Sequence, residues 1–304
     1  MLSGYESEGI QPNEPLCRLS WRAPCHFSYN RFSMRWLPGV LILVGSVYAQ
    51  WVKYPTAGVP RTADGKPDLN ARAPRTADGK PDLSGMWLPN DELPCPKMLV
   101  DDLGACAERV APSRQAANIG FGIPGGLPIQ AWAAELQKKR AVNAGRNDPH
   151  THCLPSNFPR LFTLPHITKV VQTPALIVLL NEFNASYRQI FTDRRPLPVD
   201  PQPSWNGYST GEWQGDELVV ETTGFRDDLW MDSQGAPLTS AAKVKERFRR
   251  PNFGVLEIQA LVDDPKAYTK PWAVSLKLHI VLDTELIDEV CLEGERSVEH
   301  IPVQ

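Results

Sequence analysis

Two stretches of the sequence decide the fold: GVLEIQALV at Gly254–Val262 and WAVSLKLHIV at Trp272–Val281. In each stretch an apolar side chain occupies every second position, and most of the positions between are polar or charged. Because successive residues of a strand point to opposite faces, this alternation predicts strands with one buried and one exposed face. Such strands are typical of antiparallel sheets.

Similar segments extend the pattern back to residue 160. They are rich in β-branched, aromatic and aliphatic residues and are bounded by Pro, Gly or Asp, which indicates strands separated by turns. About eight to ten sequential strands predict a mainly β fold, either an antiparallel up-and-down barrel or a strongly curved sheet of the lipocalin type. Besides the two stretches above, the segments are 168–181, 186–192, 207–213, 216–223, 243–249 and 285–291.

One α-helix is predicted at residues 128–144, flanking the sheet. The apolar residues Ile129, Trp132, Ala133 and Leu136 recur at the spacing of one helical face. Charged residues occupy the opposite face, so the helix is expected to lie on the surface of the β-domain.

Residues 1–49 are predicted to form a leader that carries an export signal. Two arginines precede a short apolar run at 37–47, and small residues end it at Ala49, as in signal peptides that are cleaved. The run is shorter than the roughly 20 residues of a membrane-spanning helix, which favours cleavage over a retained anchor. A translation start at Met34 would leave residues 1–33 outside the protein. We therefore expect a secreted or periplasmic protein with no stable membrane span.

A tandem repeat follows the leader in a Pro-rich tail at residues 50–84. The sequence PRTADGKPDL occurs at Pro60–Leu69 and again at Pro74–Leu83. Its Asp-Gly and Lys-Pro pairs favour turns, so the segment is predicted to be an extended, turn-punctuated tail. It is either a solvated linker or an element that is bound by its own domain or by a neighbouring subunit. Residues 85–304 are expected to form a single β-rich domain.

The cysteines indicate disulfides. Two of the six lie in the predicted leader, which leaves an even number in a chain expected to enter an oxidising compartment. We favour pairing Cys95 with Cys106 and Cys153 with Cys291, because the second bond closes a very long loop. The alternative is four buried free thiols.

Four motifs of the mature chain stand out: PRTADGKPDLSGMW at 74–87, DPHTHCLP at 148–155, GEWQGDELVVETTGF at 211–225 and DDPKAYTKPW at 263–272. With these motifs the chain resembles a large family of uncharacterised exported bacterial proteins. The resemblance implies export and brings no activity with it. In addition, Gly85-Met86-Trp87 is similar to the Gly-x-Trp of the first strand of lipocalins.

Charge excludes one class of partner. The net charge is −3 and no Lys/Arg block stands out, whereas phosphate binding needs a concentrated basic face. Nucleic acid is therefore not expected.

A metal site is one candidate for chemistry. His150 and His152 point the same way if the segment is extended, and with His166 they could hold zinc or copper. The alternative is that these histidines only hydrogen-bond to the backbone. No other cofactor is evident.

Glu246 is the weak candidate for a catalytic carboxylate. Lys243, Lys245, Arg247 and Arg249 alternate with it and are expected to form an exposed face, which places Glu246 on the interior side. Cross-strand charge pairing is the alternative use of these charges.

Tryptophans at strand ends are the candidate ligand-binding residues, namely Trp205, Trp213, Trp230 and Trp272. Aromatic rims can stack on sugars or apolar ligands, but large rings also simply fill the ends of a barrel.

These observations favour an exported, non-catalytic β-domain that binds a partner or assembles with itself through its tail, for example into an extracellular fibril. The alternatives are a small-molecule or metal-dependent enzyme with a site in the barrel, and a carbohydrate-binding protein. The expected partner is accordingly either another copy of the chain or a small ligand or glycan.

Overall fold

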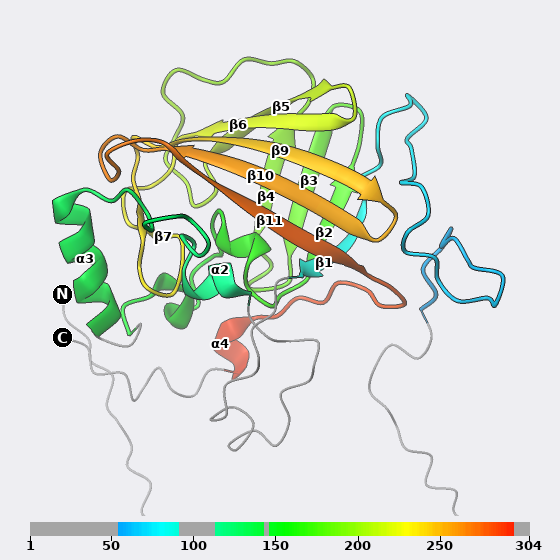
Figure 1. Ribbon diagram of the computed structural model, residues 1–304, viewed down its shortest axis with the longest axis horizontal. Coiled ribbons are helices and arrows are strands. Elements are labelled where there is room, and N and C mark those ends of the chain that lie inside the picture. The colour runs from blue at the N-terminus through cyan, green and yellow to red at the C-terminus, as the bar shows by residue number, and fades with distance from the viewer. Residues whose placement is uncertain (1–53, 91–112, 143–145, 295–304) are drawn as a thin grey trace, which may run out of the picture. The chain divides into compact units, whose positions relative to one another are not determined.

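The structure, a computed structural model, describes residues 54–90, 113–142 and 146–294 (Figure 1). The predicted leader and the predicted Cys95–Cys106 bond lie outside these residues. The barrel strands are β1 (Gly85–Pro89), β2 (Thr168–Gln172), β3 (Leu176–Asn181), β4 (Tyr187–Phe191), β5 (Tyr208–Gln214), β6 (Glu217–Thr223), β9 (Lys243–Asn252), β10 (Val255–Asp263) and β11 (Trp272–Val281).

These nine strands close into a barrel in the order β1, β11, β10, β9, β6, β5, β4, β3, β2, and β2 pairs again with β1. The prediction of a mainly β barrel is therefore confirmed. Eight of the nine pairings are antiparallel, and the pairing of β4 with β5 is parallel. A closed barrel with an odd number of strands requires at least one parallel pair. Strands that alternate in direction all the way around can close antiparallel only if their number is even.

The barrel interior is filled by the side chains that the alternation predicted. Leu256, Ile258, Ala260 and Val262 of β10 are all buried. Their neighbours on β11 are the buried residues Val274, Leu276, Leu278 and Ile280, and the register pairs Ile258 with Leu276. Burial of each such side chain contributes about 1.5–3 kcal/mol, so this packing is a main source of stability.

Two predicted strands differ in the structure. Segment 168–181 is a hairpin rather than one strand, since β2 and β3 are separated at residues 173–175, which include Pro174. Segment 285–291 is not a strand and makes only an isolated bridge between Glu289 and Phe183. β1 already occupies the free edge of β11, so the closed barrel leaves no edge for a further strand.

The described helices are few and short. The largest is α3 (Ala131–Val142), which lies within the predicted range and contacts the short strand β8 (Pro237–Leu238). Figure 1 shows α3 beside β7 (Leu229–Trp230), the partner strand of β8, rather than inside the barrel. The other elements are α2 (Arg114–Ala117), α4 (Cys291–Gly294) and two 3₁₀ turns at Pro149–His152 and Arg160–Phe162. Among the described residues no helix is long and apolar enough to cross a membrane.

The two copies of the tandem repeat form the same loop. In the first copy Thr62 N donates to Lys66 O at 2.9 Å, and Arg61 Nη1 donates to Gly65 O at 2.7 Å. The second copy repeats both bonds, from Thr76 to Lys80 and from Arg75 to Gly79, at the same distances.

The tail contacts the barrel of its own chain. Arg75 forms an ion pair with Asp216, at the turn between β5 and β6, with a shortest distance of 2.6 Å. Gly254 N donates to Leu69 O at 2.8 Å, and Leu83 at the end of the second copy is buried in the core.

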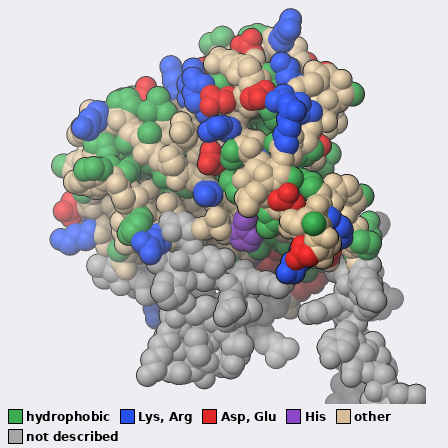
Figure 2. Space-filling model, turned by 45° about the vertical axis from the view of Figure 1, so that its right-hand side comes forward, with side chains coloured by type: hydrophobic (Ala, Val, Ile, Leu, Met, Phe, Trp, Pro, Cys, Tyr) green, Lys and Arg blue, Asp and Glu red, His purple; other side chains and the backbone are tan. Residues whose placement is uncertain are grey.

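Charges on the outer face of β9 are paired across strands. Lys245 contacts Glu221 of β6 at 2.9 Å, and Arg247 contacts Glu217 at 3.1 Å. On the face drawn in Figure 2, Lys and Arg side chains are interspersed with Asp and Glu. Such cross-strand pairs are the use of these charges that the sequence allows as the alternative to an interior site.

Candidate functional site

A groove lies at the parallel seam of the barrel. β4 and β5 pair at only two positions, Ile190 with Ser209 and Phe191 with Thr210. A hollow of about 480 Å³ is lined by the remainder of β4, the start of β5 and the segment that precedes β5. This volume falls in the range of small-molecule sites. Its lining residues are Pro155, Asn184–Phe191 without Ile190, and Ser204–Ser209.

Four aromatic side chains line the groove. Tyr187 is 62% exposed, which is unusual for a large ring and leaves it free to stack on a ligand. Phe191 and Tyr208 stack on each other with centroids 5.1 Å apart. Trp205 is half-buried, and the guanidinium of Arg226 lies 4.6 Å from the centre of its ring.

Amide groups lie beside these rings. Asn206 Nδ2 donates to Ser156 O at 3.2 Å and to Tyr187 O at 3.3 Å, which fixes the orientation of the amide. Asn206 Oδ1 is buried and has no hydrogen-bond partner in the described part of the chain. Asn184 and Gln189 also line the groove. Gln189 offers both a donor and an acceptor, and Asn206 Oδ1 a further acceptor, as hydroxyl groups require.

A buried ion pair lies at the groove. Arg188, which is among the lining residues, donates to both carboxylate oxygens of Glu246 and also to Ser209 and Thr222. Glu246 is fully buried inside the barrel, on the interior side that the alternation of β9 predicted. Its carboxylate is bound to Arg188 and has no exposed surface among the described residues, and its catalytic role stays a prediction.

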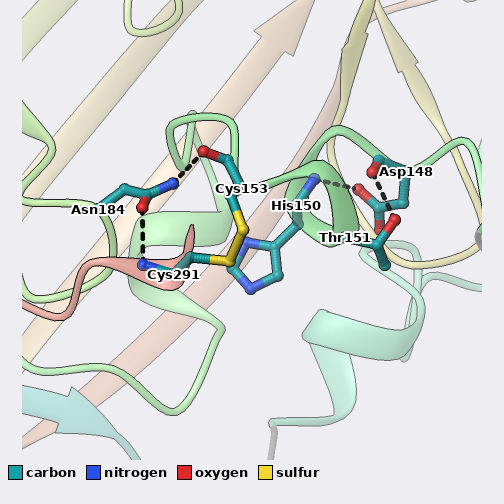
Figure 3. The surroundings of a disulfide bond; sticks show 6 residues. All are labelled: Asp148, His150, Thr151, Cys153, Asn184 and Cys291. Atoms are coloured by element: carbon teal, nitrogen blue, oxygen red, sulfur yellow. Dashed lines mark hydrogen bonds between the residues drawn. A yellow bond between two sulfur atoms is a disulfide. The ribbon is translucent and has the colours of Figure 1, made fainter. Parts of the chain in front are cut away.

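The turn between β3 and β4 forms one rim of the groove, and a disulfide anchors it (Figure 3). The Cys153–Cys291 bond is present, with Cα atoms 5.4 Å apart, which confirms that predicted pair. Asn184 bridges its two ends, since Nδ2 donates to Cys153 O and Oδ1 accepts from Cys291 N at 3.1 Å. Asn184 and Ala185 both have positive φ, 53° and 45°.

The three predicted metal-binding histidines do not share one site. His152 is exposed and its Nε2 lies 2.6 Å from Arg146 O. His150 stacks on Phe183 with centroids 3.8 Å apart, and burial, together with Arg160 and His166, lowers its pKa to about 3. His166 contacts Glu289 instead, with Nδ1 3.0 Å from Oε2. The extended segment that this prediction assumed is absent, since Pro149–His152 is a 3₁₀ turn; His150 and His166 lie side by side, with ring centroids 5.7 Å apart, whereas His152 faces Arg146 O.

Of the four predicted ligand-binding tryptophans, only Trp205 lines the groove. Trp272 is buried and packs edge-on against Tyr268 at 5.4 Å. Trp230 is buried beneath the guanidinium of Arg140, 4.7 Å from its ring centre. Trp213 is half-buried against the core. Trp272 begins the barrel strand β11, whereas Trp230 lies on β7, outside the barrel strands.

The sequence analysis missed Phe191, Asn206 and the groove as a whole. Tyr187 and Phe191 are four positions apart on one strand and so share its outer face, which is a readable signal. The parallel pairing that brings them beside Trp205 and Tyr208 leaves no such signal, because it depends on the path of residues 192–207.

No protein-family model, curated protein or solved structure matches this chain. The fold and the site therefore rest on the geometry described above.

Proposed function

We propose that this protein is a non-catalytic binding protein whose ligand is a neutral saccharide, held in the groove at the seam of β4 and β5. The observation that carries the proposal is the lining of that groove. Four aromatic rings and three amides meet there, and the only charged lining residue, Arg188, is already paired with Glu246.

The chemistry of the lining supports a neutral sugar. A sugar ring presents an apolar C–H face, which an exposed ring such as Tyr187 can cover, and a rim of hydroxyls, which amides can both donate to and accept from. An acidic or basic ligand would bring an unpaired charge against a lining that offers no free counter-charge.

The disulfide supports a location outside the cytoplasm. Bonds of this kind persist in oxidising compartments and are rare in the bacterial cytoplasm. We therefore propose that the protein acts in the periplasm or after secretion, as the export signal at residues 1–49 predicts.

Isothermal titration calorimetry against a panel of neutral and charged oligosaccharides tests this function. We expect neutral sugars to bind, and Tyr187→Ala and Trp205→Ala each to lower the affinity by at least about 2 kcal/mol, roughly 30-fold, as buried aromatic contacts do. Trp132→Ala is the matched control, because Trp132 is 46% exposed and lies on α3 away from the lining. Equal loss in all three variants, or binding of charged sugars alone, would contradict the proposal.

A second candidate function is self-assembly through the tail. The two copies of the repeat form the same loop, with Arg61 in the first and Arg75 in the second. Of these two arginines, only Arg75 is paired with a carboxylate within the described chain, that of Asp216. Arg61 is thus available to dock the first copy on an acidic turn of a neighbouring chain, which would extend into a fibre.

Light scattering of the mature chain tests this assembly. Arg61→Ala is expected to reduce the particle size to that of the monomer. Lys66→Ala, in the same loop, is the control and is expected to leave the size unchanged. A wild-type protein that is already monomeric at high concentration would exclude assembly by this route.

A further inference from the structure

Three ligating side chains meet next to the disulfide, outside the groove. His166 precedes β2, Glu182 follows β3, and Glu289 precedes α4. One ring nitrogen of His166 and one carboxylate oxygen from each glutamate all lie within 4.8 Å of one another. Segments more than 100 residues apart in the chain therefore converge on one small volume.

The backbone holds this cluster together. Glu289 N donates to Glu182 O at 3.1 Å, and Asn184 N donates to Glu289 O at 2.7 Å. Cys291, two residues beyond Glu289, is bonded to Cys153. The position of Glu289 is therefore fixed on both sides by contacts that do not involve its own side chain.

The charges of the cluster are not balanced. In the part of the chain that the structure describes, no Lys or Arg forms an ion pair with Glu182 or Glu289. Glu182 accepts a hydrogen bond from Ile167 N at 3.1 Å, and Glu289 faces His166. Two carboxylates held together without a Lys or Arg partner repel each other, and a bound cation would remove that repulsion.

We propose that His166, Glu182 and Glu289 bind a divalent transition-metal cation of the Zn²⁺ type. One imidazole nitrogen and two carboxylate oxygens are ligands that zinc accepts in tetrahedral sites, and the fourth position would be left to water or another small ligand. Ligand atoms on a zinc ion lie roughly 3.3 Å apart when the bonds are 2.0–2.1 Å long. The His166–Glu289 pair, at 3.0 Å, is close to this spacing, and the ligand atom of Glu182 lies within 4.8 Å of both.

This site is separate from both sites considered above. It shares only His166 with the histidines that the sequence pointed to, and none of its three residues lines the groove. Metal binding and saccharide binding can therefore succeed or fail independently.

Zinc titration of the full-length protein, followed by calorimetry and by metal content after dialysis, tests the proposal. We expect about one zinc ion at this site, and at least a roughly tenfold loss of affinity in each of His166→Ala, Glu182→Gln and Glu289→Gln. Glu289→Gln is the decisive variant, because the side chain is 45% exposed and the substitution preserves its shape.

His152→Ala is the matched control, since His152 lies in the adjacent turn but outside the cluster. Zinc affinity that is lost in Glu289→Gln and retained in His152→Ala supports the site. No zinc uptake by the wild type, or equal affinity in Glu289→Gln and the wild type, would overturn it, as would a loss in His152→Ala as large as that in Glu289→Gln.

Discussion

Arg188 and Glu246 form an ion pair inside the barrel, with Arg188 Nη1 3.0 Å from Glu246 Oε1 and with side chains that are 1% and 0% exposed. Ser209 and Thr222 complete the hydrogen bonds of the guanidinium. The pair joins β4 to β9 across the interior, next to the only parallel seam among the barrel strands.

Removal of one partner is expected to be costly. Glu246→Gln leaves a buried guanidinium without its counter-charge, so the free energy of unfolding should fall by about 3–5 kcal/mol. The double substitution Arg188→Met with Glu246→Leu should cost less than Arg188→Met or Glu246→Leu alone, because it leaves no unpaired charge. Urea unfolding of these four variants checks this order. Exposed ion pairs contribute no more than about 1 kcal/mol to stability. A Glu246→Gln protein whose free energy of unfolding lies within about 1 kcal/mol of the wild-type value would therefore contradict the burial of this pair.

The disulfide is expected to contribute strongly to stability. The bond closes a loop between residues 138 apart, for which the chain-entropy model predicts about 5 kcal/mol, and measured values are typically 2–4 kcal/mol. Cys153→Ser with Cys291→Ser should therefore lower the urea midpoint markedly, and reduction of the wild type should have the same effect. An unchanged midpoint after complete reduction would contradict a structural role for the bond.

Stability is expected to fall in acid because of His150. Its pKa in the folded chain is about 3, against an ordinary value of 6.5. Between these values the unfolded chain binds a proton that the folded chain does not, so the free energy of unfolding decreases as the pH falls from 6.5 towards 3. The limiting slope is about 1.4 kcal/mol per pH unit.

His150→Phe keeps a ring against Phe183 and removes the titrating group. The slope of the unfolding free energy against pH should therefore decrease by about 1.4 kcal/mol per pH unit, which corresponds to one proton. Urea unfolding at several pH values, with a chelator present, measures this slope. Equal slopes for His150→Phe and the wild type would contradict the assignment.

Two turns should respond in opposite ways to exchanges of Gly and Ala. Ala185 has φ 45°, a conformation that costs a residue with a Cβ roughly 1 kcal/mol, so Ala185→Gly should stabilise the protein by up to that amount. Gly215 has φ 62° with open space around it, so Gly215→Ala should destabilise by a similar amount through backbone strain alone. Thermal unfolding compares the two, and a shift of the same sign in both would contradict this geometry.

The sequence predicts those parts of the fold that local periodicity determines. Alternation in β10 and β11 identified their buried faces, and the charges of β9 placed Glu246 in the interior. Closure of the barrel is different, because it depends on which strands meet. The segment at 285–291 has a strand-like composition but finds no free edge, since β1 pairs with β11.

The candidate site was less predictable for the same reason. The groove depends on the route of residues 192–207, which turns β5 parallel to β4, and no residue pattern encodes that route. Histidine spacing suggested a metal site on the assumption of an extended segment. Asp148 instead caps a 3₁₀ turn there, and its side chain accepts a hydrogen bond from His150 N. His150 and His152 therefore lie on a turn and not on an extended segment.

The indole N–H signals of the tryptophans report directly on ligand binding at the seam of β4 and β5. In a ¹⁵N-labelled protein titrated with a neutral oligosaccharide, we expect the Trp205 signal to shift in proportion to occupancy, whereas those of Trp230 and Trp272 stay fixed. Assignment by single Trp→Phe substitutions identifies each signal. A Trp205 signal that does not move while Trp213, Trp230 or Trp272 responds would contradict a binding site at the seam of β4 and β5.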